Sequence, residues 1–224
     1  MEMVKGSIGW LTMVNEFGVF THSRLEADPK MKDLAESFIK RQDELERKGN
    51  AFNQAQRTIS ALEAQMVKAD YDLDNTVRDL YFSKLGACGN NKKDPAILRW
   101  FPDGLTALIR CSFDEEAGKV TALIAVLSET PDDPVVARIL PNLKALLETY
   151  QKSIAGLKAA ITAAGNAWEL VEAEKINWLV AYSKSYGDVL SILNGDKRSA
   201  DTFFKKVSKS PKDDGDTPPE PPKA

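Results

Sequence analysis

The residue types most often used in catalysis and metal binding are scarce in this chain. Its 224 residues include a single histidine, His22, and two cysteines, Cys88 and Cys111. Zinc fingers, multi-histidine metal centres and disulfide scaffolds need more of these residues than the chain contains. A serine or cysteine nucleophile would depend on His22 as its base, and we expect His22 to be a surface residue beside a loop. Cations near the cysteines could depress a thiol pKa, but no second catalytic feature accompanies either one.

Three acidic residues at alternating positions, Asp70, Asp72 and Asp74, match the opening of a calcium-binding loop. The rest of the pattern fails, because the sixth position is Asn75 instead of glycine and the twelfth is Tyr81 instead of glutamate. We interpret the three aspartates as a solvated acidic face of a helix.

Two further kinds of site are excluded by their motifs. Di-metal helical bundles use paired Glu-x-x-His motifs, and this sequence contains none. The segment Gly86-Ala87-Cys88-Gly89 has neither the length of a phosphate-binding loop nor its Lys-Ser/Thr ending. We therefore predict no catalytic residue, no metal ligand and no cofactor.

A seven-residue apolar repeat predicts the first long helix of the chain. Eight consecutive positions of the repeat are apolar: Met31, Phe38, Leu45, Phe52, Ile59, Met66, Leu73 and Leu80. Residues 30–85 contain no proline and only one glycine, Gly49. This pattern is typical of a long helix with one buried face, which we place at residues 29–86.

A second long helix is predicted at residues 141–194 from two series of positions seven residues apart. One series is Leu147, Ile154, Ile161, Trp168, Lys175, Tyr182 and Val189, and the other is Tyr150, Leu157, Ala164, Val171, Trp178, Ser185 and Ile192. Alanines and two glycines are frequent at residues 155–173, where we expect the closest helix packing.

Shorter helices are predicted from their ends. Asp-Pro pairs at residues 28–29, 94–95 and 133–134 suit helix starts, since aspartate caps the first free N–H groups and proline fits the first helical position. Ser112 with Glu115 forms a candidate capping box, Asp196 is a candidate cap, and Asn194-Gly195 suits a helix end. Short helices are expected between the two long ones, and a further helix is expected at residues 8–20.

These elements predict an all-α fold, because no strand pattern is present. We expect an elongated antiparallel helical bundle in which shorter accessory helices pack on two long helices. Residues 1–209 would form a single domain. The Pro-rich acidic segment 210–224 has no aromatic or branched aliphatic residue and should be a disordered tail.

Composition and charge narrow the partners and the compartment. The chain has 30 Lys and Arg against 33 Asp and Glu, a formal charge of −3, so no general nucleic-acid binding is expected. No signal peptide is recognisable, and the longest apolar run, around residues 122–127, is far shorter than the roughly 20 residues of a membrane span. Two widely separated cysteines suit a reducing interior, so we expect a cytoplasmic protein; the sequence is compatible with free Cys88 and Cys111 and with a bridge between them.

Two segments are candidate interaction surfaces. The first is Arg99-Trp100-Phe101, which either anchors a partner or closes one end of the bundle. The second is Phe203-Phe204-Lys205-Lys206 on a short terminal helix, where one phenylalanine could dock and the other could face a partner groove or an anionic surface.

The sequence therefore predicts a non-enzymatic structural or protein-interaction protein, a scaffold, adaptor or assembly component. A protein partner or a homo-oligomer is expected, because apolar flanks such as Ile39, Val77 and Leu146 are free for further helices unless the chain's own short helices cover them. The alternatives are a membrane-active or toxin-type helical protein and an enzyme with an unrecognised site near Cys88 or His22.

Overall fold

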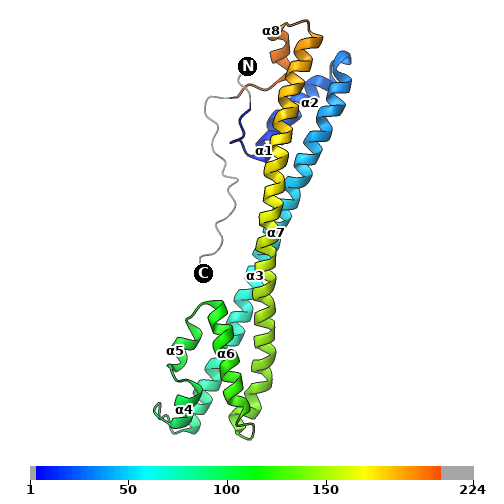
Figure 1. The fold of residues 1–224 in the computed structure, drawn as a ribbon. Helices are drawn as coiled ribbons and strands as arrows, with labels where there is room; N and C mark the ends of the chain where they lie inside the picture. The colour runs from blue at the N-terminus through cyan, green and yellow to red at the C-terminus, as the bar shows by residue number, and fades with distance from the viewer. Residues whose placement is uncertain (1–3, 208–224) are drawn as a thin grey trace. The chain divides into compact units, whose positions relative to one another are not determined.

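The computed structural model describes residues 4–207, and within that range the chain is helical with no strand, which confirms the predicted all-α class (Figure 1). Along the chain the elements are α1 (Trp10–Thr12), a π-helical segment (Met13–Gly18), α2 (Val19–Glu26), a 3₁₀ turn (Pro29–Met31), α3 (Lys32–Ala87), α4 (Pro95–Trp100), α5 (Gly104–Ile109), α6 (Phe113–Ser128), α7 (Pro134–Ile192), α8 (Lys197–Ala200) and a final 3₁₀ turn (Asp201–Phe203). The segment 210–224, predicted to be a disordered tail, lies outside the described residues.

The start of the second long helix differs from the prediction. We expected it at residue 141, but α7 begins at Pro134 and continues through Pro141. Asp133 caps this start by accepting a bond from the Val135 N–H at 2.9 Å. Proline inside a helix removes one backbone bond, yet Ile139 and Leu143 are buried on both sides of Pro141. Their common apolar face holds the helix together across the proline.

The other predicted helix ends are confirmed. Asp28 accepts a bond from the backbone N–H of Lys30, Asp94 from that of Ala96 and Asp196 from that of Arg198, at 2.8–3.0 Å. Ser112 and Glu115 form the capping box at the start of α6. Asn194 and Gly195 adopt the left-handed conformation after α7, with φ of 53° and 84°. These contacts are made within a few residues, so local sequence is enough to specify them.

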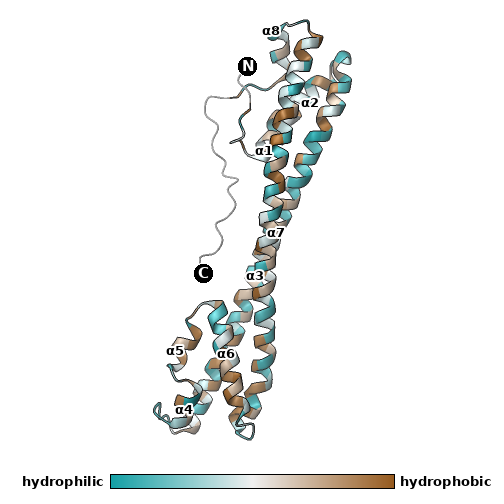
Figure 2. Ribbon diagram, in the orientation of Figure 1, coloured by the Kyte–Doolittle hydropathy of each residue, from teal (hydrophilic) through white to brown (hydrophobic). Residues whose placement is uncertain are grey.

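Burial confirms the seven-residue repeats. Seven of the eight positions of the first repeat, which runs from Met31 in the 3₁₀ turn through α3 to Leu80, are buried, and Ile59 is partly buried. Both series of α7 are buried or partly buried except at Ile192, which is 40% exposed near the helix end. In Figure 2 hydrophobic and hydrophilic residues alternate along α3 and α7, as expected of helices with one buried face.

The chain divides into two compact units, and both long helices contribute to each. Within the described residues, unit 1 comprises residues 4–57 and 162–207, and unit 2 comprises residues 58–161. The apolar repeat of α3 continues across residues 57 and 58, which is why the sequence predicted one domain without a division.

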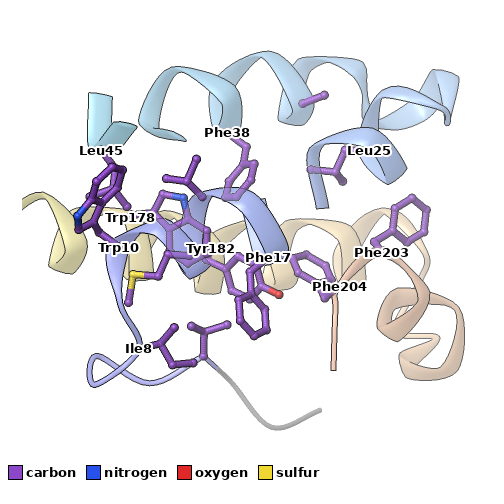
Figure 3. Close-up of a cluster of buried hydrophobic side chains, with 14 of the residues drawn as sticks. Ile8, Trp10, Phe17, Leu25, Phe38, Leu45, Trp178, Tyr182, Phe203 and Phe204 are labelled. Carbon is purple, nitrogen blue, oxygen red and sulfur yellow. The ribbon is translucent and has the colours of Figure 1, made fainter. Parts of the chain in front are cut away.

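Aromatic side chains form much of the core of unit 1. Phe38 of α3 packs against Trp178 and Tyr182 of α7, with ring centroids 5.8 and 6.1 Å apart. Phe52, further along α3, meets Trp168, earlier on α7, so the two helices run antiparallel within this unit. Figure 3 shows side chains from the N-terminal helices, α3, α7 and the C-terminal segment pointing into this cluster.

Two glycines let the N-terminal helices approach α3 closely. A Cβ atom on Gly49 would overlap the indole ring of Trp10, and one on Gly18 would overlap the side-chain amide of Gln42. The helix expected at residues 8–20 therefore forms, with a π-helical segment ending at Gly18. Gly18 weakens helix propensity, but its missing side chain leaves room for the Gln42 amide.

Unit 2 has a mainly aliphatic core. Helix α6 buries Val120, Leu123 and Leu127 in a cluster with residues of α3 and α7. The same cluster buries Val77 completely and Leu146 partly, so these two predicted free flanks are covered by the chain itself. Unit 2 is thus built from the α3–α7 pair with α6 packed along it.

Candidate functional site

A buried acidic cluster lies where three helices of unit 2 meet. Glu116 of α6 is only 2% exposed. The Tyr150 hydroxyl of α7 lies 3.1 Å from Glu116 Oε2 and 3.3 Å from Asp70 Oδ1 of α3, and it donates to these carboxyl groups. Asp74, one helical turn after Asp70, completes the cluster and pairs with Arg78 at 2.9 Å. We call Asp70, Asp74, Glu116 and Tyr150 the acidic cluster.

Burial changes the protonation of this cluster. The pKa of Glu116 is raised to about 8, chiefly by burial and then by the nearby carboxylates of Asp70 and Asp74, while the Tyr150 hydrogen bond opposes the shift. Burial also raises the pKa of Asp74, although Arg78 opposes the shift. The pKa of the Tyr150 phenol is raised by burial and by the same acids. This shift favours the protonated form of Glu116 near neutral pH, which is unusual for a carboxyl group.

The predicted solvated acidic face is only partly correct. Asp72 fits it, because its carboxylate pairs with Lys68 at 2.6 Å on the outer side of α3. Asp70 and Asp74 instead face Glu116, which lies more than 40 residues away in sequence and carries no local signal. In the part of the chain that the structure describes, no group of three or more His, Cys, Asp or Glu residues is placed to hold a metal ion.

The first predicted interaction segment lies mostly in the interior of unit 2. Trp100 and Phe101 are 4% and 2% exposed, as expected of residues that close a helical bundle. The Lys84 ammonium lies 4.5 Å from the centre of the Trp100 ring and 2.5 Å from Asp133. Arg99 alone reaches solvent, where it pairs with Glu129.

A cavity of about 260 Å³ adjoins this segment. Its walls come from the α4–α5 turn, α5 and α6, and include Trp100, Leu108, Leu123 and Val126. The one lysine among its lining residues, Lys119, is engaged with the backbone carbonyl of Ala107 at 2.7 Å. The walls offer an apolar lining, and their cations are already paired.

The second predicted segment differs from the expectation. Phe203 and Phe204 are both buried, at 8% and 2% exposure, so neither faces outward. Phe204 follows the final 3₁₀ turn in extended backbone and packs against Tyr182, so its place is set by the core of unit 1. Lys205 pairs with Glu16 at 2.6 Å, and Lys206 is exposed.

The histidine and the two cysteines lie in different units: His22 belongs to unit 1, and Cys88 and Cys111 belong to unit 2. His22 lies within α2 and not beside a loop, because the helix extends to Glu26. Cys88 and Cys111 are free, which decides the question of a bridge. Burial raises the pKa of both thiols, and Asp94 adds to the effect at Cys88. The lysines expected to lower these values are outweighed.

A groove between α3 and α7 crosses the surface of unit 1, with a volume of about 370 Å³. Four of its lining residues are apolar and six are polar. The apolar ones are Leu34, Phe38, Val180 and Ala181, and the polar ones are Ser37, Arg41, Asn177, Lys184, Ser185 and Asp188. Val180 is 64% exposed, and Ile176, one turn earlier on α7, is 63% exposed. We call this groove with its two exposed side chains the open face of unit 1.

The corresponding hollow between α3 and α7 in unit 2 is polar. Its volume is about 300 Å³, and Arg138 of α7 pairs with Asp79 of α3 across it at 3.1 Å. The Arg138 guanidinium also lowers the pKa of Asp79. Asn142 donates to Thr76 at 3.5 Å nearby. Polar side chains of unit 2 thus pair with each other across the hollow, whereas the groove of unit 1 includes the exposed apolar Val180.

Comparison of the chain with known proteins identified no relative. No protein-family model matches the chain, and no significant match was found among curated proteins or solved structures. Across residues 4–207, none of the helices combines the length and the apolar character needed to cross a membrane.

Proposed function

We propose that this chain is a non-enzymatic structural protein, an assembly component that binds a second copy of itself through the open face of unit 1. The observation that carries the proposal is the exposure of Ile176 and Val180 on α7 at a groove that is also lined by the apolar Leu34 and Phe38. Contiguous exposed apolar groups next to a hollow are typical of interaction surfaces.

A second copy is the occupant favoured by the shape of this face. Ile176 and Val180 are exposed one turn apart on α7, and Val180 also lines the groove with Leu34 and Phe38. A two-fold symmetric contact requires one patch to be complementary to itself, and a groove with exposed apolar side chains meets that requirement.

The charges around the groove support the same occupant. Arg41 and Lys184 line it together with Asp188, so both signs are present. Arg41 also forms an ion pair with the carboxylate of Glu174, at 3.7 Å. A face of mixed charge avoids the like-charge repulsion that a single-sign face would meet in its own copy.

Unit 2 supplies an internal comparison. In unit 2, α6 packs on the α3–α7 pair. The polar hollow between α3 and α7 is bridged by the ion pair of Asp79 with Arg138. Val67 of α3 is as exposed as Val180, at 62%, but it does not line the groove of unit 1. Val67 therefore provides a matched control of the same residue type and exposure.

The test is the mass in solution by size-exclusion chromatography with light scattering over a range of concentrations. Wild-type protein should have twice the mass of the chain. Ile176→Glu with Val180→Glu should weaken association by at least about a hundredfold, because four carboxylates, two from each copy, would be desolvated in the contact. Val67→Glu should leave the mass unchanged, and circular dichroism should show equal helix content in all three proteins.

A strictly monomeric wild-type mass would overturn the proposal, as would a Val67→Glu variant that dissociates the dimer equally. A photo-crosslinking residue at position 180, used in cells, distinguishes a second copy of the chain from a different protein partner. Adducts formed with a different protein and none with the chain itself would show that another partner, not a second copy, occupies the open face.

A further inference from the structure

We infer that Glu116 is a proton-binding site of unit 2: one proton shared between Glu116 and the facing aspartates fastens α6 to the α3–α7 pair, and its loss loosens α6. This is a proton-controlled contact in a different unit from the open face, so it stands on separate observations.

The first observation is an excess of acidic groups in the interior. Glu116 is 2% exposed and faces Asp70 and Asp74, while Arg78 is the cation paired with this group, through Asp74. Arg78 is 47% exposed and lies toward solvent. Three ionised carboxylates around one buried position would repel each other with little screening. A bound proton removes one of the three charges.

The second observation is the set of hydrogen bonds. Glu116 Oε2 accepts from the Tyr150 hydroxyl. Glu116 Oε1 and Asp74 Oδ1 are fully buried, and no protein donor is directed at either oxygen. An ionised carboxylate only accepts hydrogen bonds, whereas a protonated one also donates. A proton on Glu116 would supply the missing donor between α6 and α3.

The position of Glu116 in its helix opposes protonation. Glu116 sits in the first turn of α6, where free N–H groups favour the ionised form. Burial outweighs that effect.

The groups facing Glu116 come from each neighbouring element. Helix α3 supplies Asp70 and Asp74 with Arg78 behind them, and α7 supplies the Tyr150 phenol. The segment before α6 supplies Cys111, whose thiol pKa is raised by burial. Glu116, at the centre of these groups, has a pKa raised to about 8.

The sign of the pH dependence follows from this displacement. The folded-state pKa of Glu116, about 8, lies above its ordinary value of 4.5. Its contribution to stability is fully present below the ordinary value and is lost as pH rises through the folded value. From about pH 5 to about pH 8, the unfolding equilibrium constant of unit 2 should rise by on the order of a hundredfold.

Urea unfolding of the full chain at several pH values tests the inference, with 5-fluorotryptophan as the probe. Trp100 is the tryptophan of unit 2, and Trp10, Trp168 and Trp178 belong to unit 1. The ¹⁹F resonance of Trp100 therefore reports unit 2, and a Trp100→Phe variant assigns it. In wild-type protein its transition should move to lower urea as pH rises over this range.

Two variants of adjacent residues provide the comparison. Glu116→Gln keeps the shape and stays neutral, so most of the hundredfold change should disappear. Glu115→Gln removes an exposed carboxylate and retains the capping box, because glutamine also serves at that position. It should behave as wild type. Equal pH dependence in wild type and Glu116→Gln would overturn the inference.

A second measurement uses wild-type protein, so its result does not depend on whether a variant folds. In protein labelled with ¹³C-glutamate, the Glu116 carboxyl resonance should titrate with a midpoint near pH 8. A midpoint near the ordinary value of 4.5 would show that Glu116 is ionised at neutral pH and would overturn the proton-binding site.

Discussion

The two units are built on the same two helices but pack in different ways. Unit 1 uses aromatic rings such as Trp178 and Tyr182, and its N-terminal helices approach α3 closely at Gly49. Unit 2 uses mainly aliphatic side chains and buries Glu116 beside Tyr150. A continuous pair of long helices therefore does not impose one kind of core; the elements packed against the pair decide it.

The surfaces of the two units differ in the same sense. Unit 1 leaves apolar side chains open beside its groove, whereas unit 2 bridges its hollow with Asp79 and Arg138. Unit 1 thus leaves Ile176 and Val180 exposed, and unit 2 buries Glu116 against two further carboxyl groups. Association is expected from the first and pH dependence from the second.

The largest effect is expected from Gly49→Ala. The added methyl group would overlap the rigid indole of Trp10, so unit 1 should lose about 3 kcal/mol despite the better helix propensity of alanine. Urea unfolding followed by the ¹⁹F resonances of the unit 1 tryptophans measures this loss. Gly165→Ala is the control, since its site is open and the change should stabilise by up to about 1 kcal/mol. Equal effects at the two sites would remove the argument for close packing.

An intermediate effect is expected from removing the hydroxyl of Tyr150. Tyr150→Phe deletes its bonds to Glu116 and Asp70 and should cost unit 2 about 2 kcal/mol. Tyr182 is also completely buried, and the groups near its hydroxyl are the neutral Thr21 side chain and the Lys205 backbone. Tyr182→Phe should therefore cost less than about 1 kcal/mol in unit 1. The same unfolding experiment compares the two, and a reversed order would contradict the contrast between the cores.

The smallest effect is expected from Arg138→Gln. Its ion pair with Asp79 joins side chains that are 57% and 52% exposed, so the loss should stay below about 1 kcal/mol and shrink further in high salt. Thermal unfolding at low and high salt measures it. A larger loss that persists in high salt would mean that the polar surface of unit 2 contributes to its stability as much as its core does.

Predictions from local patterns succeeded because their physical causes are local. An aspartate cap such as Asp94 bonds to an N–H two residues away, and the repeat that includes Leu45 and Leu73 needs only a helix with one buried face. Pro141 was misjudged because its local cost was weighed without the buried residues on either side. One of Phe203 and Phe204 was expected to face outward, yet both are buried in the core of unit 1.

The acidic cluster was missed for a different reason. Asp70 and Asp74 form an ordinary acidic pattern on a helix, and Glu116 is one of three successive acids at the start of α6. Which of these acids turns inward depends on how α6 is rotated against α3 and α7. The one available signal was the apolar face containing Val120, Leu123 and Leu127, since Glu116 lies one turn before Val120 on that face.

The sequence by itself therefore determined the helices, their ends and the side of each long helix that is buried, because those features depend on contacts within one or two turns. The tertiary structure alone decided which charges are buried, which apolar residues remain open and where the chain divides into two units. These properties depend on which distant element covers a given face, and the solvation of Glu116 or Val180 is set by that covering and not by the neighbours of either residue in sequence.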